Sequence, residues 1–270
     1  MVNNKILIKF PSVSMIMIFS LTGLLGCSNG MQSGSNSSAP PLDQKTEEPY
    51  CGVTKYSSLS SPYTITGTAE FKYRVTVINS PPGVVGLYGI SQRNIPYSEI
   101  QVYNSAGSLI ECGETGASGE INLQIPKAEG DYTIKIFSRA NNAHIKVHVL
   151  KDINSNEAHS ISKSFTIGAE ASQSLGLLTA QADENISAGL EGGAFNILYQ
   201  IYKANESIRT KTSNSSFVAD KVTVFWKAGF NPYSYFDSGD PDPLSFYLPG
   251  DRELYISGGK NGNVKTQDTD

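Results

Sequence analysis

Apolar and polar residues alternate with a period of two over much of the first half of the chain, from about residue 63 to residue 150. Along 71–77, the odd-numbered positions are Phe, Tyr and Val, and the even-numbered positions are Lys, Arg and Thr. This alternation is typical of strands that bury one face. The same period recurs in the segments 100–102, 121–125, 132–136 and 145–149.

Turn-forming residues separate these apolar runs. The separators are rich in Pro, Gly, Ser and Asn, which favour tight turns. Short strands with frequent turns and no helical period predict a small antiparallel β-sandwich. The separators are Pro81-Pro82-Gly83, Ser105-Ala106-Gly107, the segment 116–119 and Asn141-Asn142.

The pattern changes after residue 150. The segment 160–167 reads as one more strand, and apolar residues at helical spacing predict an amphipathic helix over 194–208. Strands are then expected at 222–226 and within 245–257, on either side of an aromatic and acidic loop. Helix and strands together predict a small, incomplete α+β region behind the sandwich. The helical apolar positions are Ala194, Ile197, Leu198, Ile201, Ala204 and Ile208.

The N-terminus has the layout of a secretory signal. Lys5 and Lys9 precede an apolar run over 13–25. A membrane-spanning helix needs about 20 apolar residues, so this run is too short to be one. The alternative interpretation is a buried N-terminal strand or helix.

The run ends in Leu24-Leu25-Gly26-Cys27, which resembles the processing site of bacterial lipoproteins. The resemblance implies cleavage after Gly26, lipidation of Cys27 and attachment to a membrane of the cell envelope. Ser28 follows the cysteine, and in Gram-negative lipoproteins a residue other than aspartate there implies delivery to the outer membrane. In the alternative interpretation, Cys27 is incidental.

The residues after Cys27 predict a flexible tether. The segment 28–49 is Ser, Asn, Gly, Pro and charged residues with few apolar side chains, so it cannot offset the entropy of ordering. Twenty-two such residues have a root-mean-square span of about 26 Å. The predicted organisation is a signal peptide over 1–26, a tether over 27–50, a β-sandwich over 51–152 and the α+β region over 153–270.

The charge argues against nucleic acid as a partner. Cleavage after Gly26 would remove two of the 21 basic residues and none of the 25 acidic ones, which leaves a net charge near −6. Phosphate backbones are bound by clusters of Lys and Arg, and the sequence has no such block.

Two cysteines remain once Cys27 carries lipid. Cys51 and Cys112 form an even pair in an exported protein, where disulfides persist, so we expect a bridge between them. The alternative is two separately buried thiols.

Within the strand-rich half, four segments resemble the carboxypeptidase regulatory-like domain, a transthyretin-like β-sandwich. The resemblance covers about 85 residues and implies a non-catalytic module. The four segments are Ile65-Thr66-Gly67-Thr68-Ala69, Ile95-Pro96-Tyr97-Ser98-Glu99-Ile100-Gln101-Val102, 116–123, and Ile125-Pro126 with Gly130-Asp131-Tyr132-Thr133-Ile134.

A second resemblance lies in the C-terminal half. The segments 194–198, 222–226 and 254–256, followed by Asp268-Thr269-Asp270, resemble the opening of a secreted zinc-metallopeptidase-like domain. In that arrangement an H-E-x-x-H helix would follow shortly, and this chain ends first. The resemblance implies the catalytically incomplete front of a peptidase.

The sequence offers little catalytic chemistry. A hydrolytic zinc site needs three protein ligands, and the only histidines are His144, His148 and His159. His144 and His148 are predicted on one strand, about 13 Å apart and both facing solvent. Asp237, Asp240 and Asp242 depart from the calcium-loop pattern. We therefore expect no metal, no cofactor and no catalytic residues.

The aromatic side chains of 226–235 form a candidate ligand platform, with core packing as the alternative. The first interpretation of the whole chain is a lipid-anchored, exported, non-enzymatic interaction or structural module that binds a protein or glycan. The alternatives are the incomplete peptidase and a glycan-binding surface protein. The candidate platform residues are Trp226, Phe230, Tyr233 and Tyr235.

Overall fold

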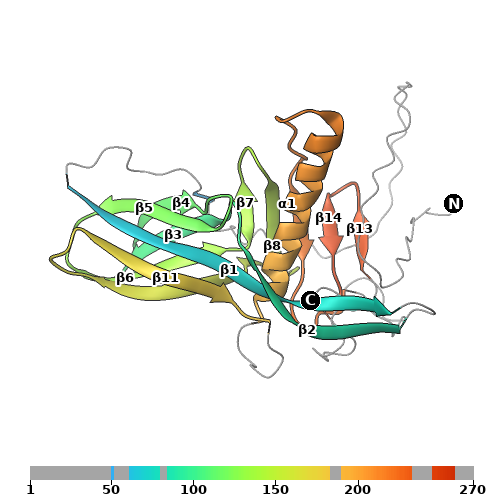
Figure 1. Ribbon diagram of the computed structural model, residues 1–270, viewed down its shortest axis with the longest axis horizontal. Helices are drawn as coiled ribbons and strands as arrows, with labels where there is room; N and C mark the ends of the chain where they lie inside the picture. The colour runs from blue at the N-terminus through green and yellow to red at the C-terminus, as the bar shows by residue number, and fades with distance from the viewer. Residues whose placement is uncertain (1–49, 52–60, 80–83, 183–189, 233–244, 259–270) are drawn as a thin grey trace.

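The computed structural model describes residues 50–51, 61–79, 84–182, 190–232 and 245–258 (Figure 1). Within these ranges strands dominate, and one helix follows them. In chain order the elements are β1 (Pro62–Asn79), β2 (Val84–Asn94), β3 (Glu99–Asn104), β4 (Leu109–Glu114), β5 (Glu120–Pro126), β6 (Gly130–Phe137), β7 (Arg139–Asn141), β8 (Lys146–Asp152), β9 (Ser155–Ala158), β10 (Ser160–Ile167), β11 (Ser172–Ala180), α1 (Gly192–Thr212), β12 (Val222–Phe225), β13 (Phe246–Leu248) and β14 (Glu253–Tyr255).

Two four-stranded sheets of the described chain form a β-sandwich. One has the order β11-β1-β2 with β5 also paired to β1, and the other has the order β10-β6-β3-β4. Alternating residues of both sheets point inward and share one core, as the period of two requires. The mainly β fold and the sandwich are therefore confirmed. The core includes Ile65, Phe71 and Leu123 from one sheet and Ile100, Val102, Ile134 and Ile136 from the other.

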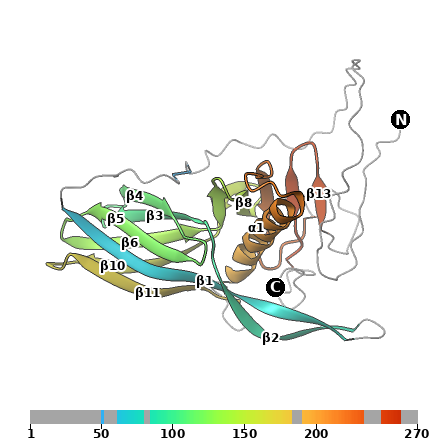
Figure 2. The ribbon, with the colours of Figure 1, turned by 45° about the horizontal axis from the view of Figure 1, so that its top comes forward.

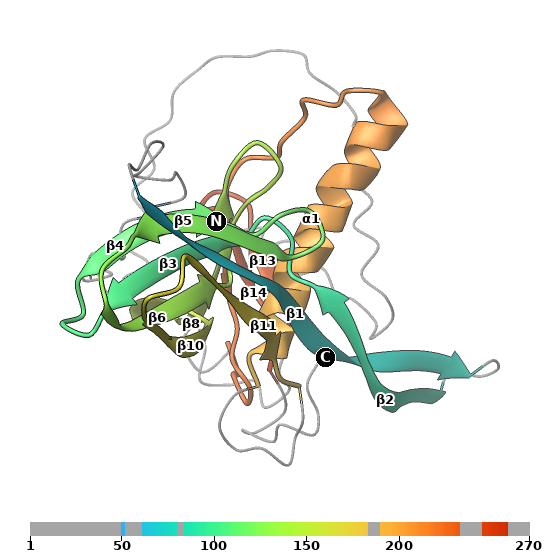
Figure 3. The same ribbon diagram turned by 60° about the vertical axis from the view of Figure 1, so that its left-hand side comes forward.

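Strand β1 has 18 residues and extends beyond the part that pairs with β11 and β5. It pairs with β11 as far as Phe71, and with β2 from Glu70 to Asn79. Beyond Phe71, β1 and β2 continue together as a two-stranded ribbon that projects from the body, as Figures 1 and 3 show. The β1–β11 pair is parallel, which the sequence pattern did not reveal.

A third sheet lies beside the sandwich, with the order β13-β14-β12-β8-β7. Its three central strands, β8, β12 and β14, are parallel, and both outer strands are antiparallel to their neighbours. Helix α1 packs on one face of this sheet (Figure 2). The opposite face packs in a separate cluster that includes Leu150, Phe225 and Tyr255. Burial of both faces is usual for parallel strands.

Strand pairing divides the chain differently from the expected boundary at residue 152. Strand β8 precedes that boundary, yet it pairs with β12 in the third sheet. Strands β10 and β11 follow the boundary, yet they pair with β6 and β1 in the sandwich. The chain therefore leaves the sandwich at β7 and returns to it before α1.

Helix α1 is longer than the predicted 194–208. It starts against the sandwich, because the Gly192 amide donates to the Gln181 carbonyl (2.7 Å) and a Cβ at Gly192 would lie 2.2 Å from the Lys72 carbonyl oxygen. Its last residue is Thr212, and the C-cap residue Ser213 has a left-handed φ of 53°. The described residues contain no helix that is long and apolar enough to cross a membrane.

Candidate ligand-binding groove

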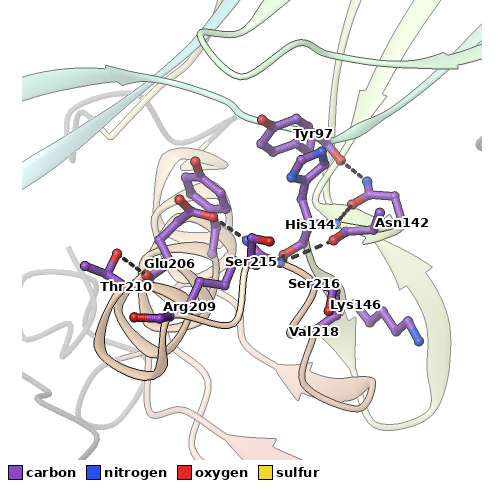
Figure 4. A pocket seen from close by; sticks show the side chains of 13 residues that line it. Tyr97, Asn142, His144, Lys146, Glu206, Arg209, Thr210, Ser215, Ser216 and Val218 are labelled. Atoms are coloured by element: carbon purple, nitrogen blue, oxygen red, sulfur yellow. Dashed lines mark hydrogen bonds and ion pairs between the residues drawn. The ribbon is translucent and has the colours of Figure 1, made fainter.

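A groove of about 1030 Å³ lies between the C-terminal half of α1, the turn that joins β7 to β8, and the loop before β3 (Figure 4). We call it the helix–hairpin groove. Aromatic, hydroxyl, amide and charged side chains line it together. Its lining residues are Tyr97, Asn142, Ala143, His144, Lys146, Tyr202, Glu206, Arg209, Thr210, Ser213, Ser215, Ser216 and Val218.

Arg209 holds three walls of the groove together. Its side chain is 9% exposed, and its guanidinium donates from Nε to the Phe217 carbonyl (2.7 Å) and from Nη2 to the His144 carbonyl (2.6 Å). Its Nη1 pairs with the Glu206 carboxylate one turn earlier on α1. Five donors on one planar group make such multiple anchoring characteristic of arginine. The helix, the β7–β8 turn and the segment after α1 are therefore fixed relative to one another.

Asn142 ties the β7–β8 turn to the loop before β3. Its Nδ2 donates to the Tyr97 carbonyl (3.0 Å), and its Oδ1 accepts from the His144 and Ile145 amides (2.9 and 3.1 Å). An asparagine that bonds to the backbone two residues ahead stabilises a tight turn locally. One side chain thus both shapes the turn and positions Tyr97.

Tyr97 occupies an unfavourable backbone conformation. Its φ is 53°, and a non-glycine residue in this region costs on the order of 1 kcal/mol or more unless its surroundings impose it. Its amide donates to the Gly116 carbonyl (3.4 Å), in addition to the bond from Asn142. Strained residues of this kind concentrate at functional sites. This conformation marks Tyr97 as a candidate contact residue.

Three rings from three elements meet at the groove. The Tyr97 ring stacks on the His144 ring with centroids 3.8 Å apart and planes 9° apart. The Tyr202 ring of α1 lies 5.5 Å from the Tyr97 ring at an angle of 60°. Burial, followed by the charge of Glu206, raises the pKa of both tyrosines above the usual value of 10. Their hydroxyl groups therefore stay protonated at neutral pH and can donate hydrogen bonds.

The predicted aromatic platform does not form as expected. Trp226 is 0% exposed and Phe230 is 2% exposed, and each belongs to a core cluster beside the third sheet. Neither ring is accessible to a ligand, so the alternative of core packing is correct for these two. Tyr233 and Tyr235 lie outside the described residues, as do Cys27 and the three aspartates of the 237–242 loop.

The histidines are placed separately, and two predictions about them are wrong: His144 and His148 do not share a strand, and His148 does not face solvent. His144 is exposed in the turn before β8. His148 on β8 is only 3% exposed, because both faces of the third sheet are packed against other parts of the protein. His159 is buried, where its Nε2–H donates to the Trp226 carbonyl (2.7 Å) and its Nδ1 contacts Glu191. Across the described ranges, no three His, Cys, Asp or Glu side chains come together as metal ligands.

The expected disulfide between Cys51 and Cys112 is confirmed. It fastens residue 51 to β4, next to a buried ion pair between Glu99 and Arg139 that are 0% and 1% exposed. The Cys51 amide donates to Glu99 Oε1 (2.9 Å). The start of the described chain is therefore joined both to the sandwich and to β7.

Sequence reasoning missed the groove. In the sequence, Tyr97 stood out only as part of a family motif, and Asn142 only as a turn residue. Glu206 and Arg209 lie at the end of α1 with the i, i+3 spacing that brings helical side chains together, which was a usable signal. No periodicity connects Tyr97, Asn142 and Tyr202, because they come together only through the tertiary fold.

Comparisons with known proteins add no family. No protein-family model matches the chain, and a search of curated proteins finds no match.

Proposed function

We propose that this chain is a non-catalytic binding protein of the bacterial cell envelope, anchored by lipid at Cys27, and that the helix–hairpin groove takes a sugar chain. The observation that carries the proposal is Tyr97: its backbone has a left-handed conformation, and its ring stacks on the His144 ring at the groove. Two hydrogen bonds to the Tyr97 backbone maintain this strained conformation and keep the ring in place before a ligand arrives, which lowers the entropic cost of binding.

Sugar chemistry suits the groups around this ring. A sugar ring has an apolar face and a rim of hydroxyl groups, and binding sites for such ligands combine aromatic surfaces with a few placed polar groups. Tyr97 and Tyr202 supply rings and hydroxyl donors, and Glu206 supplies a carboxylate acceptor. Arg209 and Asn142 fix these groups through the bonds described above, so the groove is formed before binding.

Removing the central ring should weaken glycan binding. We expect the full-length wild-type chain to bind a subset of glycans on an array, and Tyr97→Ala to lower the affinity for those glycans about tenfold or more, because aromatic anchors dominate contact surfaces. Tyr202→Ala should act in the same direction. Titration of the best glycan by calorimetry measures both losses.

The matched control is Tyr247→Ala, because Tyr247 is also an exposed tyrosine (43%) but lies on β13, and it does not line the groove. It should leave glycan affinity unchanged, and thermal unfolding should show that all three variants fold. An array without a hit, or glycan binding that survives both groove substitutions, would contradict the proposal.

The anchor is tested separately. Cells that express the wild-type chain should incorporate a fatty-acid analogue into the protein, and Cys27→Ser should abolish that labelling, since the thiol accepts the lipid in proteins with this processing site. Cys51→Ser is the control, because its labelling per molecule of protein should equal that of the wild type. Labelling of Cys27→Ser would refute the anchor.

A second candidate is the N-terminal, catalytically incomplete part of a secreted zinc metallopeptidase. The third sheet favours it: three parallel strands covered by α1 and bordered by the antiparallel β13 give the α+β arrangement that the resemblance implies. The DNA that follows the Asp270 codon tests it. An H-E-x-x-H sequence encoded shortly downstream would support the peptidase, and its absence there would favour the stand-alone module.

A further inference from the structure

Residues 50 and 51 form a short strap that crosses from the predicted tether to the body of the protein. Cys51 is bonded to Cys112 of β4, and the Cys51 amide donates to Glu99 of β3. The Tyr50 hydroxyl donates to Glu114, the last residue of β4. The strap is therefore attached to the sandwich by one covalent bond and two hydrogen bonds.

The strap also contacts the hairpin made by β7 and β8. The Tyr50 ring stacks on the His148 ring of β8, with centroids 6.4 Å apart and planes 25° apart. The backbone of Asn141 in β7 lies close to the Tyr50 phenol. Burial, and then the bond to Glu114, raises the pKa of Tyr50, so the phenol remains neutral and keeps its hydrogen atom for Glu114.

A second link runs from the strap to the same hairpin. Glu99 accepts the Cys51 amide and also pairs with Arg139, the first residue of β7. Both ion-pair partners are buried, so the attraction between them is not screened by water. The strap thus contacts the hairpin directly through Tyr50 and indirectly through Glu99.

The turn of this hairpin is one wall of the helix–hairpin groove. Asn142 follows Asn141 directly and His144 comes two residues later, and both line the groove. Asn142 carries the bond that positions Tyr97, and His144 carries the ring on which Tyr97 stacks. The strap's contact at Asn141 therefore directly adjoins Asn142, a residue of the groove wall.

We propose that the Cys51–Cys112 disulfide holds Tyr50 against the β7–β8 hairpin, and that this contact fixes the hairpin wall of the groove, so that reduction of the disulfide loosens the wall and weakens ligand binding. The effect on the wall stands on the contacts alone, whereas the effect on binding rests on the proposed function. The strap would then couple the anchored end of the chain to its ligand site.

The chemical step is an ordinary thiol–disulfide exchange. A dithiol reductant such as dithiothreitol gives two electrons and two protons, the Cys51–Cys112 bond breaks, and two thiols form while the reductant closes to its own disulfide. No other atom of the protein changes. Loss of this bond leaves Tyr50 held only by hydrogen bonds and stacking.

Hydrogen–deuterium exchange of the full chain tests the wall directly. After reduction, the amides of 139–147 should exchange about tenfold faster or more, because local opening is governed by the free energy of the contacts that close the segment. In the sandwich, the amides of β6 and β10 that exchange by local opening should keep their rates, and those that exchange only by global unfolding should follow the loss of global stability. The variant Cys51→Ser with Cys112→Ala should reproduce the reduced protein without any reductant.

Tyr50→Phe tests the contact of the strap while the disulfide stays intact, so that misfolding caused by loss of the bridge cannot explain the result. It keeps the bridge and the ring but removes the hydroxyl, so hairpin exchange should rise by a smaller factor. Tyr63→Phe is the matched control, because it removes a phenol hydrogen bond to Gln173 within the sandwich and should leave the hairpin unchanged. Unchanged hairpin exchange in the reduced, folded protein would overturn the proposal.

Binding distinguishes the two proposals from each other. If a glycan found for the wild type binds the reduced protein as tightly, the coupling fails and the groove assignment stands. If no glycan binds the wild type while reduction still speeds hairpin exchange, the groove assignment fails and the mechanical role of the strap stands.

Discussion

Arg139→Met is expected to lower the free energy of unfolding by about 3 to 5 kcal/mol, because it leaves the Glu99 carboxylate buried without its cation. Glu99 and Arg139 are 0% and 1% exposed, so water cannot replace the lost partner. Methionine fills much of the volume of the arginine stem, so the loss reflects charge more than a cavity. Urea unfolding followed by circular dichroism measures the difference in free energy.

Two further variants identify the cause. Adding Glu99→Gln to Arg139→Met removes the stranded charge while the amide oxygen still accepts from Cys51 and Gln101, so about 2 kcal/mol should return. Lys151→Met breaks an exposed ion pair with Glu157 and should cost no more than about 1 kcal/mol. An Arg139→Met loss as small as that of Lys151→Met would contradict the expectation.

Much of the sandwich was predictable because alternation reports directly on burial. In β6 the pattern marked Tyr132, Ile134 and Ile136 as one face, and all three are in the core. The helix was predictable for the same reason, with a different period. Its last turn was missed because Arg209 is polar, although its guanidinium is buried by hydrogen bonds to carbonyl groups rather than by apolar contact.

Strand partners were not predictable, because a period of two identifies the buried face of a strand and not its neighbour. The segment 145–149 alternates like the sandwich strands, but Val147 and Val149 pack against α1 in the third sheet. His148, between them, was expected in solvent and is buried because a central strand of this sheet has no open face. Only the tertiary fold distinguishes the two environments.

The candidate site could not be predicted from the sequence either, because its residues come together only in the folded chain. A dense run of aromatic residues is equally suited to a core and to a ligand surface, and Trp226 and Phe230 are in the core. The groove instead uses Tyr97, Tyr202 and His144, which are isolated in the sequence and gather in space. Composition found the disulfide, because pairing two cysteines in an exported chain needs no knowledge of the fold.

Removal of the disulfide is the second large effect. The variant Cys51→Ser with Cys112→Ala should lose about 4 kcal/mol, because the bridge spans 61 residues and restricts the unfolded chain by closing a loop of that size. Alanine is chosen at Cys112 because this side chain is fully buried and a serine hydroxyl there would add its own cost. Urea unfolding without reductant measures the loss.

Dithiothreitol provides the internal control for this prediction. It should bring the wild type down to the stability of the double variant and leave the variant itself unchanged, since no bridge remains to be reduced. A wild type that keeps its stability in dithiothreitol, with mass analysis showing free thiols, would contradict the loop-closure account.

Tyr50→Phe completes the comparison. It leaves the unfolded chain cross-linked, so it should cost only about 1 kcal/mol, the value of native hydrogen bonds. A much larger loss in Tyr50→Phe would mean that contacts of the strap in the folded state, more than the cross-link in the unfolded state, hold this end of the protein.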